Sequence, residues 1–216
     1  NPNVYSAYYE ALSYAVDQGA AVVIAAGNDD AYSGTHLSIP AAFSSLIDGV
    51  ISVAAISNTG DLTDYTNYGS LVTIAAPGGS DYVGAGILST VPSASYQEMP
   101  GTSMASPIVA GTAALIKAEN PHFTPADIET IITDSADKYR DMSSLIEDGN
   151  YLNLKDALTL AQTYQPSITP TPTPDPTPSL ATETSSNIDV PVSKKWSKHL
   201  WEKSGKDGII NYYIDK

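Results

Sequence analysis

The chain of 216 residues contains no cysteine, so it can form neither disulfide bonds nor thiolate metal sites, although secretion is still compatible with this. It has no apolar run of roughly 18 residues, which argues against a membrane-spanning helix. Basic residues are scarce: 10 Lys and Arg face 24 Asp and Glu, for a net charge of −14. Such an acidic surface repels nucleic acid and favours solubility. The chain opens at Asn1 without Met or signal peptide, which predicts a cut inside a longer protein.

Proline is concentrated in one stretch. In residues 169–178 every second position is Pro, and proline removes backbone donors, which predicts an extended linker over 167–188. Residues 189–216 are too apolar for a flexible tail and too short for a stable domain, so they predict the start of an unidentified C-terminal module. Trp196 and Trp201, with nearby lysines, could contact a cell surface or wall polymer; the alternative is a fragment of an unrelated fold.

Residues 1–166 alternate between helical and strand patterns. Three nearly continuous apolar runs predict strands that are covered on both faces, at residues 20–26, 49–56 and 71–75. The first helix is expected over residues 3–18, ending at Gly19. Its predicted buried face consists of Val4, Tyr8, Leu12, Ala15 and Val16. Helix–strand alternation with two-sided burial predicts an α/β fold with a mainly parallel sheet between helices.

The second half is mainly helical. A helix from Ser103 to about Glu119 is apolar almost all round, which predicts a position in the core. Thr124 followed by Pro125 predicts the start of the next helix, and a short helix is expected over residues 153–162. The buried face of the middle helix is predicted to contain Ile128, Ile131, Ile132 and Ala136.

Ser103 lies among small residues at the start of this core helix. The first turn of a helix offers free N–H groups and a positive dipole end, which favour the negative charge that develops during nucleophilic attack. The small neighbours, including Gly101, let a substrate backbone approach closely. The alternative from spacing alone is that Thr102 or Ser103 is merely the N-cap.

The segment 101–107, Gly-Thr-Ser-Met-Ala-Ser-Pro, followed by Val109-Ala110-Gly111, resembles the nucleophile motif of the subtilisin-like serine proteases, the subtilases. The resemblance implies that Ser103 is the nucleophile. Ile108 stands where the family usually has His, and Pro100 where a polar residue is usual. Neither position belongs to the catalytic triad.

A second segment, residues 22–28, resembles the oxyanion-hole strand and turn of the family, and this implies that Asn28 is an oxyanion donor. Taken alone, Asn28 would read as an ordinary turn residue. Other family-like segments follow in the right order, at 38–41, 50–56, 65–69 and 75–78. The resemblance covers residues 1 to about 163 and implies a three-layer subtilisin-like fold that is incomplete at its N-terminus.

The resemblance also implies a set of substrate contacts. Part of the pocket wall is assigned to Ala25, Ala26 and Gly27, and Ser38 to the pocket floor. Met99 would face the leaving group, and Gly101 and Thr102 would lie beside the substrate backbone. The small lining favours large apolar side chains in the substrate.

The triad order of the family is Asp, His, Ser, so both partners of Ser103 should precede Asn1. His36, His122 and His199 lie in the wrong sequence context for a general base, and the isolated chain is therefore expected to be inactive. No cofactor is expected. Structural calcium is frequent in the family, but Leu71 and Thr73 replace carboxylates here, so no metal site is predicted in these residues.

The leading hypothesis is a secreted or cell-surface serine endopeptidase that acts on proteins or peptides. Two alternatives stay open: a pseudoprotease that has lost its base, and a surface-binding protein whose linker and tail do the work.

Overall fold

The structure is a computed structural model, and it describes residues 2–33, 38–82, 84–139, 143 and 145–166. The predicted linker, residues 167–188, and the predicted C-terminal module, residues 189–216, lie outside the described residues. His36 lies outside them too. These three interpretations therefore stay predictions.

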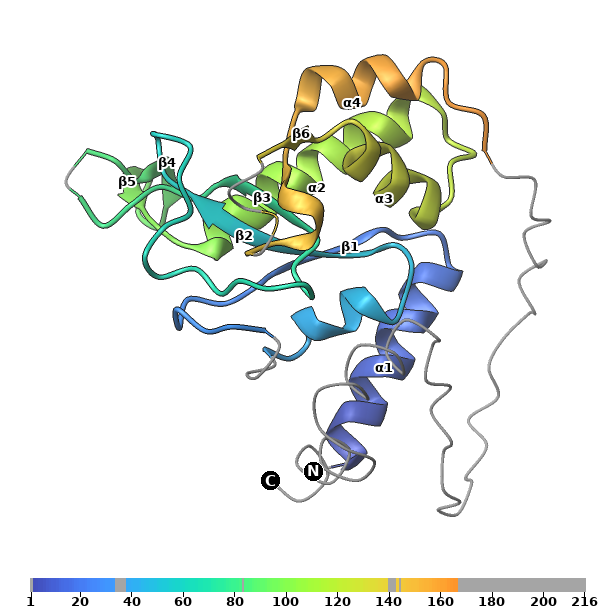
Figure 1. Cartoon of the computed structure of the whole chain (residues 1–216), viewed down its shortest axis with the longest axis horizontal. Helices are drawn as coiled ribbons and strands as arrows, with labels where there is room; N and C mark the ends of the chain where they lie inside the picture. The colour runs from blue at the N-terminus through green and yellow to red at the C-terminus, as the bar shows by residue number, and fades with distance from the viewer. Residues whose placement is uncertain (1, 34–37, 83, 140–142, 144, 167–216) are drawn as a thin grey trace.

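The three apolar runs of the sequence form three neighbouring strands of a five-stranded sheet (Figure 1). Its strand order is β1 (Val22–Ala25), β2 (Val50–Ile56), β3 (Ile74–Pro77), β7 (Asn150–Tyr151) and β6 (Asp137–Lys138). The first four strands are parallel and β6 is antiparallel to β7. All residues of β2 are buried, as the two-sided apolar pattern predicts. The predicted α/β fold class is confirmed.

Two strand predictions need correction. The first was expected over residues 20–26 with both faces covered, but β1 is shorter and only half-buried. The reason is its place at the edge of the sheet, where only β2 pairs with it among the described residues. The third was expected over residues 71–75, but β3 begins at Ile74, because Val72 donates its backbone N–H back to Gly69 in a turn.

Three helices lie on one side of the sheet: α2 (Thr102–Glu119), α3 (Pro125–Asp134) and α4 (Leu154–Ala161), with α2 against the strands and α4 packed on α2 and α3 (Figure 1). Their core with β2 and β3 includes Val109, Ile116 and Phe123, each at most 1% exposed. The expectation that α2 is buried all round is wrong, because Leu115 is 49% exposed. Only the side of α2 that faces the sheet and its neighbouring helices is covered in the described chain.

The start of α3 follows the local rules closely. The Thr124 side chain accepts the N–H of Asp127, the Asp127 carboxylate accepts the N–H of Thr124, and Pro125 begins the helix. The predicted buried residues of this segment, Ile128, Ile131, Ile132 and Ala136, are all at most 8% exposed. Both predictions are confirmed.

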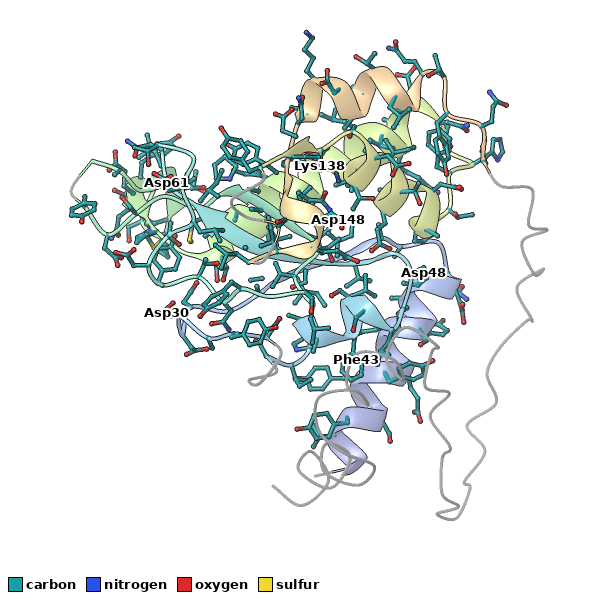
Figure 2. The ribbon with its side chains drawn as sticks, in the orientation of Figure 1. Asp30, Phe43, Asp48, Asp61, Lys138 and Asp148 are labelled. Carbon is teal, nitrogen blue, oxygen red and sulfur yellow. The ribbon has the colours of Figure 1, made fainter. Side chains whose placement is uncertain are left out.

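The opposite face carries α1 (Pro2–Asp17) and the short 3₁₀ helix η1 (Ala41–Ser45), which holds Phe43 (Figure 2). The predicted face of α1 is partly wrong, because Val4 is 47% exposed and Tyr8 41% exposed. The side chains packed inward are Tyr5, Tyr9, Leu12 and Val16. The helix is rotated by about one position, so that the Tyr9 ring lies 6.2 Å from the Phe43 ring. Helices on both faces complete the three layers.

A separate hairpin of β4 (Ile87–Val91) and β5 (Ser95–Met99) leads directly into α2. Its strands are antiparallel and mostly exposed. The 3₁₀ helix η3 (Glu147–Gly149) precedes β7. The hairpin and the loops after β1, β2 and β3 gather at the same end of the molecule, where Figure 2 marks Asp30 and Asp61. This is the carboxyl end of the parallel strands, where ligand sites of α/β sheets usually form.

Candidate active site

Ser103 is the second residue of α2 and is exposed, whereas Thr102 beside it is 1% exposed. The N-cap is Gly101, and no side chain caps the helix. Neither Thr102 nor Ser103 is therefore a structural N-cap, and that alternative for the motif is excluded. The backbone N–H of Ser103 lies in the first turn, where the helix dipole favours an anion.

Asn28 lies in the turn that follows β1 and reaches across to the start of α2. Its Oδ1 accepts two hydrogen bonds from Thr102, one from the backbone N–H at 2.9 Å and one from the hydroxyl at 2.8 Å. The same hydroxyl oxygen accepts the N–H of Gly27 at 3.3 Å. These bonds fix the orientation of the Asn28 amide, because only Oδ1 can accept and Nδ2 must point elsewhere.

Two donors border one small space beside Gly101. A methyl group placed on Gly101 would lie 3.5 Å from Asn28 Nδ2 and 3.7 Å from the backbone nitrogen of Ser103. Gly101 has a φ of +147°, a conformation that is essentially restricted to glycine. Glycine thus keeps this space open. Two fixed N–H donors around a space next to a serine hydroxyl can stabilise the oxyanion of a tetrahedral intermediate.

The backbone that carries Gly101 is held by the loop after β3. Gly101 donates its N–H to the carbonyl of Gly78 at 2.9 Å. The Tyr65 hydroxyl donates to the same carbonyl at 3.1 Å and to that of Gly79 at 2.7 Å. Burial raises the pKa of Tyr65 above its ordinary 10.0, so the phenol stays protonated and keeps donating at neutral pH.

The predicted pocket residues fall into two groups. Ala26 and Ser38 line a common small cavity, and Gly27 lies beside it, since a methyl group on Gly27 would come 3.2 Å from Ser38 Oγ. Ala25 is the last residue of β1. Met99 ends β5, outside the cavity lining. The structure thus brings Ala26, Gly27 and Ser38 together, as the resemblance implied, and their role in substrate binding stays a prediction.

The side chain of Thr102 points into the protein, which its assignment as a substrate contact did not anticipate. It was assigned to the substrate, but its hydroxyl is engaged inside the protein with Asn28 and Gly27. The side chain therefore orients the Asn28 amide, and Thr102 directly precedes Ser103 in the chain.

Sequence reasoning missed Asn67. This side chain is 2% exposed and bonds to the turn that carries Asn28. A signal was present, because Asn67 lies in the family-like segment 65–69, but sequence alone does not show that this segment contacts the turn after β1.

His122 is the only histidine among the described residues. It follows α2, whereas Ser103 lies at the start of that helix. An 18-residue helix is about 27 Å long, so His122 is far out of reach of the Ser103 hydroxyl.

No three His, Asp or Glu side chains gather as a metal site within the part of the chain that the structure describes. None of the helices found there could cross a lipid bilayer.

A comparison with protein families matches residues 1–159 to the subtilase family. The chain belongs to the subtilase family. An extracellular protease of Xanthomonas campestris pv. campestris is 41% identical over 128 residues, which cover 58% of this chain and 21% of that protein. Thermitase of Thermoactinomyces vulgaris is 35% identical over 133 residues, 62% of this chain and 42% of thermitase.

A solved protease structure agrees with the fold. A protease from Pseudoalteromonas arctica matches with a TM-score of 0.61 and 35% identity, and the match covers 70% of this chain and 46% of that one. The chain therefore spans less than half the length of the two curated relatives and the solved structure described above.

Proposed function

We propose that this subtilase chain is the C-terminal half of the catalytic domain of a serine endopeptidase. In this proposal Ser103 is the nucleophile, and Asn28 Nδ2 and the Ser103 N–H form the oxyanion hole. The observation that carries the proposal is that both donor nitrogens border the same space beside Gly101, with Asn28 Oδ1 held by Thr102. A structural serine at a helix start would not need such a pair.

The mechanism is acyl transfer. Ser103 Oγ attacks the peptide carbonyl carbon while a histidine takes its proton, and the carbonyl oxygen becomes an oxyanion held by the two donors. The intermediate collapses, the C–N bond breaks, and the amine leaves with the proton from histidine. Water, activated by the same histidine, then hydrolyses the ester on Ser103. The acid is released and Ser103 regains its proton.

The Asp and His are proposed to come from a segment that precedes Asn1 in the full-length protein. Two observations support this: the matched relatives are more than twice as long as the matched region, and His122 is too far from Ser103. A serine without a base is a poor nucleophile at neutral pH. The 216-residue chain alone is accordingly expected to have little activity.

The proposed substrates are proteins or peptides, with the cavity lined by Ala26 and Ser38 at the base of the pocket for the residue before the scissile bond. Secretion is proposed because one relative is an extracellular protease, and the absence of cysteine is compatible with it.

The test is covalent labelling with a fluorophosphonate probe. The full-length protein should be labelled and should cleave a peptide substrate, and S103A should abolish both. The isolated chain should label far more slowly. Strong labelling of the isolated chain would contradict the need for an external base. A full-length protein that is folded yet inert to the probe would support a pseudoprotease.

A further inference from the structure

The side-chain amide of Asn67 forms three hydrogen bonds with the turn that carries Asn28. Its Oδ1 accepts the N–H of Asp29 at 2.9 Å and the N–H of Ala31 at 3.0 Å. Its Nδ2 donates to the carbonyl of Ala26 at 2.9 Å. All three bonds involve backbone groups, so they hold the path of the chain rather than one side chain.

The main chain of Asn67 adds a fourth bond, because its N–H donates to the carbonyl of Gly27 at 2.9 Å. The four bonds therefore reach both sides of Asn28, to residues 26 and 27 before it and to residues 29 and 31 after it. Asn28 itself is exposed. Its position thus depends on these backbone bonds and on Thr102.

The fit between Asn67 and Gly27 is tight. A methyl group on Gly27 would lie 2.3 Å from Asn67 Nδ2, far inside van der Waals contact. Gly27 also has a φ of +107°, which favours glycine. The turn and the amide can therefore approach this closely only because residue 27 has no side chain.

The same loop also reaches the nucleophile side of the site. Tyr65, two residues before Asn67, donates to the Gly78 carbonyl, which in turn accepts the N–H of Gly101. One short segment is thus bonded directly to the turn that carries Asn28 and, through Gly78, to the stretch that leads into Ser103. A shift of Asn67 would change the position of Asn28 relative to Ser103.

We infer that Asn67 is a positioning residue for the oxyanion hole, which acts through Asn28. The inference rests on the proposed function. Loss of the amide leaves the N–H groups of Asp29 and Ala31 without their acceptor, and the turn relaxes. A misplacement of about 1 Å at an active site can cost about 10²-fold in rate.

The experiment uses the full-length protein and compares N67A with N150A. Asn150 is a matched control, because it is also 2% exposed and bonds a backbone carbonyl, that of Thr73, away from the site. N67A should lower kcat by about 10²-fold with KM little changed. It should also weaken inhibition by a peptide aldehyde, which forms an oxyanion. N150A should lower thermal stability without this loss of kcat.

A double-mutant cycle with N28A separates positioning from general damage. If Asn67 acts through Asn28, N67A should lower kcat little further in the N28A background. An equal fall of kcat in both backgrounds would overturn the inference, and so would a folded N67A protein with wild-type kcat. Full activity of N28A alone would instead overturn the proposed function.

A second variant, N67D, covers the case in which N67A does not fold. It has nearly the same shape as Asn and keeps the acceptor for Asp29 and Ala31, but it places a carboxyl oxygen opposite the Ala26 carbonyl in place of the donor. A fall in kcat that disappears in the N28A background supports the inference. Wild-type kcat, or the same fall in both backgrounds, rejects it.

Discussion

Replacement of Gly101 by alanine is a sharp test of the proposed oxyanion site. The added methyl would lie 3.5 Å from Asn28 Nδ2, 3.7 Å from the nitrogen of Ser103 and 3.6 Å from Met104 Sδ. These are ordinary van der Waals distances, so the methyl fits without a clash. It fits, however, in the space that both donor nitrogens border, and it would compete there with the proposed oxyanion.

The expected magnitudes follow from two separate effects. Gly101 has φ +147° and ψ 157°, and holding a non-glycine residue there costs about 1–3 kcal/mol of the free energy of unfolding. Removal of one oxyanion donor lowers kcat by roughly 10²–10³-fold, a magnitude measured in a subtilisin. Because the methyl obstructs both donors, G101A should lower kcat by at least about 10²-fold.

The assay measures kcat and KM with a peptide substrate and the unfolding free energy with urea, on the full-length protein. G60A is the control, because Gly60 has a φ of +88° and no atom within 4 Å of the added methyl. The G60A variant therefore has the backbone strain of an alanine at positive φ, but its methyl group lies outside the proposed active site. G60A should therefore lose stability and keep kcat. A folded G101A protein with wild-type kcat would refute the placement of the oxyanion.

Three further predictions concern side chains that hold the site or the fold. T102V removes the hydroxyl that donates to Asn28. It should lower the free energy of unfolding in urea by about 1–3 kcal/mol and should also lower kcat. An unchanged kcat would argue against the role of Thr102 in orienting Asn28. T124A removes the hydroxyl that accepts the N–H of Asp127 and should cost about 1 kcal/mol in urea unfolding without an effect on kcat. Y65F should reduce the loss of stability at alkaline pH. Burial raises the pKa of Tyr65 above 10.0, so its contribution is fully present below about pH 10 and is lost as the pH rises through the raised pKa. The check is to measure the melting temperatures of the wild type and Y65F from roughly pH 8 to pH 12. An equal fall of melting temperature with pH in both proteins would contradict the prediction.

Much of the sheet and of α3 could be predicted from the sequence, because the decisive forces there are local or have a simple pattern. Seven consecutive residues of β2 are buried on both faces, so their apolar run has no alternation. The start of α3 is set by Thr124, Pro125 and Asp127, which lie within four positions of one another. Ser103, the proposed nucleophile, and Asn28, the proposed oxyanion donor, were predicted by resemblance to family motifs.

Other features depend on contacts that a sequence does not display. In α1 the tyrosines at positions 5, 8 and 9 allow two neighbouring apolar faces, and the choice between them is made by Phe43 from a distant helix. The strands β6 and β7 have two residues each and carry no periodic signal. Asn67 lies 38 residues after Asp29, so its contact with that turn is visible only in three dimensions.

The bonds that define the candidate oxyanion site all form within the described chain. The Asn28–Thr102 bonds join residues that are 74 positions apart, and they connect the turn after β1 directly to the first turn of α2. The two proposed donors are thus fixed to each other, whereas the proposed general base belongs to another segment. Nucleophile activation and oxyanion stabilisation should therefore be separable. In the subtilisin-like mechanism, enzymes without triad members keep roughly 10³–10⁴-fold catalysis over water from the oxyanion hole and binding. Variants at Gly101, Asn28 and Asn67 should consequently reduce the residual activity of a base-deficient full-length protein as well.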